Sequence, residues 1–200
     1  MADARRYNAV AMSLHWLIAA LILANIALAW WFNGLPLGLT PEIHGIQKAR
    51  LLAIHKPIGI TVLLLSLLRL AWRLISRPPP LPASVTGWER FTANSVYVLF
   101  YVVMIGMPLT GWIMVSASKT IATYPISFFG LFNWPAIGPL TTLPKAQMHQ
   151  THELFQNLHS WGAWLAYLLV ILHVGAALRH LYLLKDDVFW RMFPFMRRPA

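Results

Sequence analysis

The stretch Leu158–Leu178, LHSWGAWLAYLLVILHVGAAL, contains 21 consecutive residues without a formal charge. About 20 apolar residues are enough to cross a bilayer as one helix, so this stretch predicts a membrane-spanning helix. Two of its residues are histidines, His159 and His173, which lie roughly 40° apart around such a helix and about 21 Å apart along it. Polar groups at these depths are costly, and neutral imidazole is a common metal ligand. Each histidine is therefore predicted to supply half of a metal site.

The composition of the whole chain also predicts a membrane protein. Of its 200 residues, 58% are hydrophobic and 11% are charged, which favours one all-α, integral membrane domain over residues 1–200. The formal net charge of +10 comes from basic residues that flank apolar runs, so it indicates membrane topology rather than nucleic-acid binding. The chain has no cysteine, which excludes disulfides, thiolate metal sites, iron–sulfur clusters and covalent haem attachment.

Three further apolar runs complete a predicted four-helix bundle, with helices at approximately 10–32, 53–74, 92–115 and 158–181. A cleaved signal peptide is the alternative for the first run, but that run is too long and too aromatic at its end. Gly106, Pro108 and Gly111 in the third run predict close packing and a kink. Residues 119–151 are rich in proline, glycine and aromatics, and are predicted to form an interfacial lid with short helical turns.

The distribution of lysine and arginine predicts the orientation of the bundle. Four crossings place both termini and the middle connection on one side, which carries eleven of the 16 basic residues, against five on the other side. Because basic residues concentrate in cytoplasmic loops, both termini are predicted to be cytoplasmic.

The depths of the histidines predict two pairs. His15 and His173 lie near the cytoplasmic ends of the first and fourth helices, whereas His55 and His159 lie at the outer ends of the second and fourth. Two imidazoles from facing helices are the axial ligands of a bis-histidine haem, and a helix bundle is its usual container. His152, seven residues before His159, is a rival for the outer ligand.

The remaining polar residues of the apolar segments have two interpretations each. Arg69 and Arg73 lie one turn apart at the cytoplasmic end of the second helix, where they bind haem propionates or extend to lipid phosphate. His44, His149 and His152 are interpreted as interfacial anchors in outer loops or at a helix start.

Four segments carry a resemblance to a known family. SLHWLIA, IHKPIGITVLLLSLLRLAWRL, GMPLTGWIMVSA and LHSWGAWLAYLLVILHVGAALRHLYLLKDDVFWRMFP resemble the bacterial cytochrome b561 family of small four-helix di-haem proteins. The resemblance implies two non-covalent b-type haems in the bacterial inner membrane, with ligands at His15, His55, His159 and His173. It also matches His180 to a family histidine close to the proposed quinone site. The long third connection has no residue-by-residue match.

The resemblance further implies an activity, because some members are similar to superoxide oxidases, which take an electron from superoxide at the outer side and reduce ubiquinone. Lys119, Lys145, His149 and His152 could make the outer mouth positive and steer an anion, or they could be ordinary solvated residues. His180 could hydrogen-bond a quinone carbonyl and pass it a proton, or simply anchor the helix end.

Two other functions remain open at this point. The chain could be a haem-bearing membrane anchor that transfers electrons for a partner dehydrogenase or hydrogenase and has no substrate of its own. It could also be a proton-coupled transporter that uses the histidines as a relay, which predicts a colourless protein. The leading hypothesis is an oxidoreductase that transfers electrons between a periplasmic one-electron donor, plausibly superoxide, and the quinone pool within membrane lipid.

Overall fold

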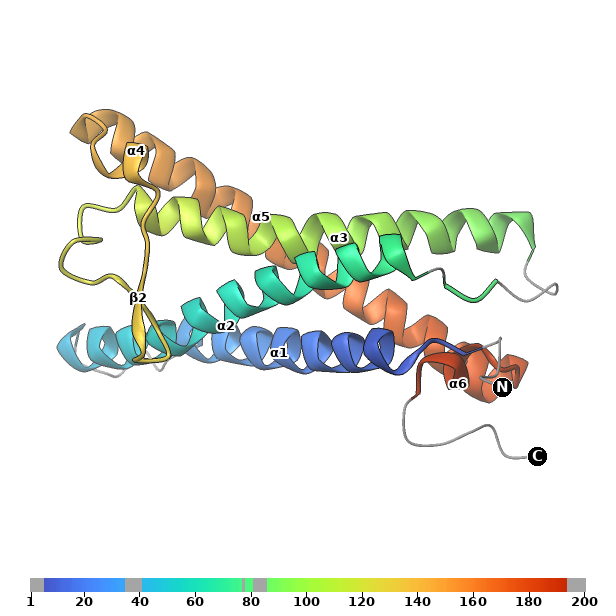
Figure 1. Cartoon of the computed structure of the whole chain (residues 1–200). Coiled ribbons are helices and arrows are strands. Elements are labelled where there is room, and N and C mark those ends of the chain that lie inside the picture. Colours follow the sequence, from blue (N-terminus) through green and yellow to red (C-terminus); the bar gives the residue numbers. More distant parts are fainter. Residues whose placement is uncertain (1–5, 35–40, 77, 81–85, 194–200) are drawn as a thin grey trace.

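The computed structural model describes residues 6–34, 41–76, 78–80 and 86–193, and it is dominated by four long helices (Figure 1). These are α1 (Ala9–Asn33), α2 (Pro41–Ile75), α3 (Gly87–Ser116) and α5 (Lys145–Leu178). Each is long and apolar enough to cross a membrane. This confirms the predicted all-α membrane fold. Figure 1 shows the start of α1 and the end of the described chain at one end of the bundle, and the short strands at the opposite end.

Two of these helices begin well before the predicted positions. α2 begins at Pro41 rather than near 53, and α5 begins at Lys145 rather than near 158. The predictions were wrong because an uncharged run marks only the part of a helix suited to the lipid interior. Charged residues such as Glu42 and Lys48 break the run, but they favour helix in water. The extended starts place His44 in α2, and His149 and His152 in α5.

The connection between α3 and α5 contains a small β-hairpin that the sequence analysis did not predict. Strands β1 (Ile126–Phe128) and β2 (Phe132–Trp134) pair antiparallel, and Gly130 between them has a φ of 77°. That conformation suits glycine because it lacks a Cβ. A short helix, α4 (Gly138–Thr141), follows and agrees with the predicted helical turns. β1 packs on α2, where Ile126 is almost fully buried. We call this side of the molecule the hairpin end.

The opposite end, which we call the α6 end, is closed by contacts between distant parts of the chain. α5 continues into a π-helical turn, η1 (Arg179–Leu184), and then into α6 (Val188–Met192). The Arg191 carbonyl accepts a hydrogen bond from the Tyr7 N–H, and the Met192 carbonyl accepts one from the Trp16 indole at 2.8 Å. Asn8 caps α1 and also hydrogen-bonds Ser76 beyond α2. These contacts join the two ends of the described chain beside His15.

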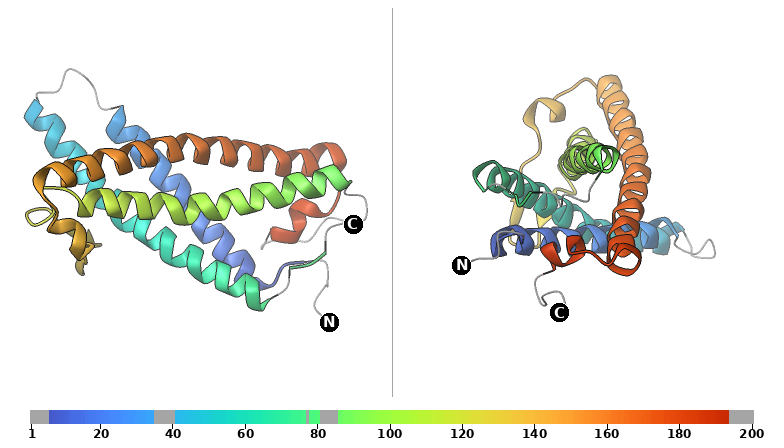
Figure 2. Two further views of the ribbon diagram at one scale, coloured as in Figure 1. Left: turned by 90° about the horizontal axis from the view of Figure 1, so that it is seen from above. Right: turned by 90° about the vertical axis from the view of Figure 1, so that its right-hand side faces the viewer.

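The helices form a chain of packed neighbours: α1 packs on α2, α2 on α3, and α3 on α5. Figure 2 shows that they cross one another rather than run parallel. Ile18, Ile58 and Val62 form a buried cluster between α1 and α2. α5 lies along α3, while its histidines face α1 and α2, and this arrangement positions the candidate site.

Candidate functional site

The α6-end histidine pair consists of His15 on α1 and His173 on α5. The centres of the two imidazole rings are 6.0 Å apart and their planes are inclined by 70°. Phe100 of α3 packs edge-on against His173 at 5.2 Å between ring centres, and Trp16 packs against His15 at 5.5 Å. The α6-end pair therefore lies in an aromatic setting formed by three helices.

The hairpin-end histidine pair consists of His55 on α2 and His159 on α5. Their ring centres are 6.3 Å apart, with planes inclined by 75°, and Phe32 of α1 packs edge-on against His55. The Asn25 carbonyl faces the His55 ring, but the buried Nδ1 of His55 has no partner in hydrogen-bonding geometry. This pair repeats the arrangement of the other pair at the opposite end of the bundle.

The spacing of both pairs fits a metal ion held between two imidazoles. With metal–nitrogen bonds of about 2.0–2.1 Å on opposite sides of one ion, the ring centres lie roughly 6 Å apart. Among the described residues, no group of three or more His, Cys, Asp or Glu side chains could hold a metal ion. A haem iron takes four nitrogens from its macrocycle and needs only axial ligands from the protein. The pairs therefore fit haem better than a bare metal ion.

The His159 ring is fixed by α3. Its Nδ1 lies 3.0 Å from the Met107 carbonyl oxygen and 3.0 Å from Oγ1 of Thr110. A carbonyl only accepts, so Nδ1 carries the proton and donates it, which leaves Nε2 free to bind a metal. Gly111 permits this approach, because a Cβ there would meet Cε1 of His159 at 3.2 Å. A Cβ at Gly162 would collide with Met107, so glycines on both helices allow the contact.

The glycine pattern in α3 was predicted only in part. Gly111 contacts α5 as expected of a close-packing residue, whereas a Cβ at Gly106 would meet nothing within 4 Å. The contribution of Gly162 and of the Met107 carbonyl was missed. The register of two antiparallel helices could have indicated that the Met107 level faces the His159 level, but a backbone carbonyl leaves no trace in a sequence.

His152 occupies a related but separate position. Its Nδ1 lies 2.9 Å from the Met114 carbonyl oxygen. This contact repeats that of His159 with Met107, because His152 lies seven residues before His159 on α5 and Met114 lies seven residues after Met107 on α3. The ring that faces His55 is that of His159. This geometry favours His159 over His152 as the partner of His55.

One histidine of the predicted positive mouth at the hairpin end lies beside a carboxylate. Lys119 and Lys145 are exposed. His149 is also exposed and lies 3.3 Å from the Glu153 carboxylate, which offsets any charge that it carries. The positive mouth therefore stays a prediction.

The two arginines at the α6 end of α2 have different neighbours. Arg69 lies close enough to His15 and His173 to act electrostatically on both rings. The Arg73 guanidinium instead lies over the Tyr97 ring, 4.0 Å from its centre, which is a cation–π arrangement. Arg69 is therefore the better placed to meet an anionic group beside the α6-end pair.

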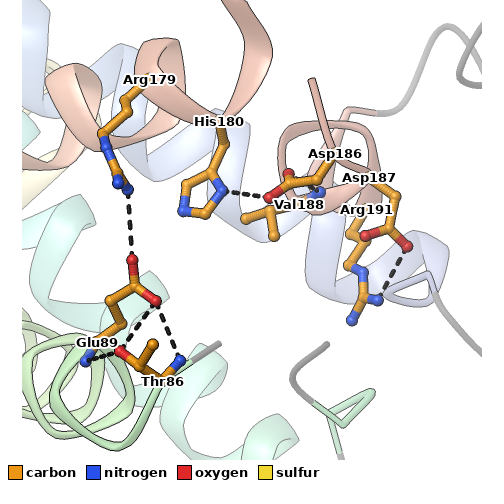
Figure 3. Close-up of polar contacts among 8 residues, drawn as sticks. All are labelled: Thr86, Glu89, Arg179, His180, Asp186, Asp187, Val188 and Arg191. Atoms are coloured by element: carbon orange, nitrogen blue, oxygen red, sulfur yellow. Dashed lines mark hydrogen bonds and ion pairs between the residues drawn. The ribbon is translucent and has the colours of Figure 1, made fainter. Parts of the chain in front are cut away.

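His180 lies beyond the α6-end pair, in the π-helical turn. Its Nδ1 is 2.7 Å from Oδ2 of Asp186, and both side chains are partly buried (Figure 3). Arg179, its neighbour, pairs with Glu89 of α3 at 3.5 Å. Glu89 also forms a reciprocal capping box with Thr86. These contacts join the end of α5 to the start of α3.

Comparison with known proteins identifies a matching family model and several relatives. The family model described as prokaryotic cytochrome b561 matches residues 6–195. Cytochrome b561 homolog 2 of Escherichia coli (strain K12) is 30% identical over 188 residues, covering 94% of this chain and 90% of that protein. Cytochrome b561 homolog 1 of the same organism is 28% identical, covering 94% and 97%. Probable superoxide oxidase CybB of Yersinia pestis is 23% identical, covering 96% and 98%.

Proposed function

This chain belongs to the prokaryotic cytochrome b561 family, whose members are b-type haem proteins of membrane electron transfer. We propose that it holds two haems and that it transfers electrons between an outer one-electron donor and ubiquinone. The observation that carries this proposal is the pair of histidine sites, with ring centres 6.0 and 6.3 Å apart at opposite ends of the bundle. A haem with two axial imidazoles supplies reversible one-electron transfer without an open coordination position.

In this proposal the α6 end faces the cytoplasm and the hairpin end faces the periplasm. The excess of basic residues on the side of the termini supports this orientation. His15 and His173 hold the haem at the α6 end, and His55 and His159 hold the haem at the hairpin end. Arg69 is the proposed partner of a propionate of the haem at the α6 end, because its charge acts on both histidines of that pair.

The donor is proposed to be superoxide, which the name of the Yersinia relative supports. At the other side His180 is proposed to bind the quinone. It lies seven residues beyond His173, at the α6 end, and its side chain is partly exposed. An imidazole can hydrogen-bond a carbonyl oxygen and can donate or accept a proton.

Haem content of single variants tests the two sites separately. His173→Ala and His159→Ala should each lower the haem content from about two to about one per chain, because each removes one of two axial ligands. The spectrum of the haem that remains should differ between the two variants. His149→Ala is the matched control on α5 and should keep both haems. A His173→Ala or His159→Ala protein that retains two haems would refute the pairing.

The activity is tested with the purified single chain and a superoxide-generating system in liposomes that contain ubiquinone. Quinol formation that superoxide dismutase abolishes is the expected result. A red protein that is not reduced by superoxide would instead support the electron-transfer subunit of a partner dehydrogenase or hydrogenase. A colourless protein would refute both functions.

A further inference from the structure

The chain reverses direction directly after His180. η1 spans Arg179–Leu184, and Lys185 then adopts a left-handed conformation with a φ of 51°. The Asp186 N–H reaches back to the His180 carbonyl at 3.3 Å. Wide turns of the π type are frequent at functional sites, and a left-handed non-glycine residue is uncommon. The result of this unusual backbone is that Asp186 faces the His180 ring (Figure 3).

The Asp186 carboxylate is held at both oxygens. Oδ2 accepts a hydrogen bond from Nδ1 of His180 at 2.7 Å, and Oδ1 accepts one from the Val188 N–H at 3.0 Å. An ionised carboxylate only accepts, so Nδ1 of His180 carries a proton and Nε2 is the nitrogen left for other partners. In Figure 3 this second nitrogen lies on the side of the ring away from Asp186. About a fifth to a quarter of each side chain remains exposed.

The charged groups around this dyad mostly have their own partners. Arg179 pairs with Glu89 of α3, and Arg191 of α6 pairs with Asp187 at 2.9 Å. Lys185 precedes Asp186 in the turn, and it too has an interaction. Asp186 is therefore the carboxylate that acts directly on His180.

We propose that Asp186 is a positioning residue for quinone protonation: it fixes the tautomer and orientation of His180, so that Nε2 delivers protons to the quinone carbonyl oxygens. This inference rests on the proposed quinone-reducing function. The carboxylate stabilises the imidazolium without becoming protonated itself, which is the role of the aspartate in a Ser-His-Asp triad.

The quinone receives two electrons, one at a time, from the one-electron donor of the proposed function. For each proton delivered, the Nε2–H bond of the imidazolium breaks, an O–H bond forms on the quinone, and His180 becomes a neutral imidazole that keeps its Nδ1–H. A hydronium ion of the surrounding water then gives a proton to Nε2 and becomes water, and a second transfer completes the quinol.

The experiment measures steady-state ubiquinone reduction between pH 5 and 9, together with reduction of the haems by the same donor. Asp186→Asn keeps the size of the side chain and removes its charge. Haem spectra and haem reduction should match the wild type, because Asp186 contacts neither histidine pair. Quinone turnover should fall at least about tenfold near neutral pH and recover in acid.

Matched variants separate the possible outcomes. Asp187→Asn changes the adjacent carboxylate, which pairs with Arg191, and should keep the wild-type pH profile. Asp186→Glu should recover part of the turnover. Uniformly slower turnover at every pH in Asp186→Asn would indicate a merely structural role and overturn the inference, as would altered haem spectra. Slow turnover in His180→Ala with a wild-type profile in Asp186→Asn would overturn the positioning role alone. Normal turnover in His180→Ala would overturn the quinone site as well.

Discussion

Replacing Gly111 with alanine is expected to disturb the hairpin-end pair selectively. The new Cβ would meet Cε1 of His159 at 3.2 Å and Nδ1 at 3.4 Å. Favourable carbon contacts begin at about 3.5 Å, so the ring must move by roughly 0.3 Å or the helices must separate. The ring resists because the Met107 carbonyl holds its Nδ1. Overpacking costs about 1–3 kcal/mol, and the gain of about 1 kcal/mol in helix propensity offsets part of this.

The net cost of up to about 2 kcal/mol predicts that the hairpin-end site binds haem more weakly, by up to about thirtyfold, while the α6-end site is unchanged. Haem titration of the apoprotein, followed by reduced-minus-oxidised spectra, measures both affinities. Gly106→Ala on the same helix is the control, since a Cβ there would meet nothing within 4 Å. Wild-type affinity at both sites in Gly111→Ala would refute the reasoning that α3 holds His159 tightly.

Three other variants test contacts around the site. Thr110→Val removes a hydroxyl that lies 3.0 Å from Nδ1 of His159 but leaves the Met107 carbonyl in place. Redox titration should therefore show that the reduction potential of the hairpin-end haem shifts by less than about 60 mV. An unchanged potential would count against the hydroxyl contact. Thr86→Ala removes the side-chain cap of α3 and should lower the free energy of unfolding by about 0.5–2 kcal/mol, which thermal melts measure. A melting temperature equal to that of the wild type would contradict this expectation. Arg191→Ala loses hydrogen bonds to a distant carbonyl and a nearby carboxylate. Limited proteolysis near α6 should become faster than in the wild type while the haem content stays constant. Equal cleavage rates in the two proteins would show that these bonds do not hold α6 in place.

The parts of the fold that follow from the lipid environment were predictable. Bilayer thickness fixes the length of an uncharged helix, so all four spans were found. The expected grouping of His15 with His173 and of His55 with His159 came from depth alone, and the structure brings these rings together. Their ligation of haem stays a prediction.

Features governed by water and by the backbone were not predictable in the same way. The starts of α2 and α5 lie among charged residues, where hydropathy no longer marks a helix. The sequence gives no sign of the left-handed conformation at position 185, because the residue there is lysine rather than glycine or asparagine. The contact between the Met107 carbonyl and His159 depends on the rotation of two helices, which sequence spacing does not specify.

The distribution of the histidines over the helices has a consequence for biosynthesis. α1 and α2 each contribute one histidine to the pairs, His15 and His55, but these belong to different pairs, and both partners lie on α5. A nascent chain emerges from its N-terminus at about 5–20 residues per second, so neither pair exists until the last long helix has been made and inserted. If the pairs hold haem as proposed, cofactor loading must follow translation of almost the entire polypeptide. A ribosome that stalls before α5 would then release a product able to enter the membrane but unable to bind haem.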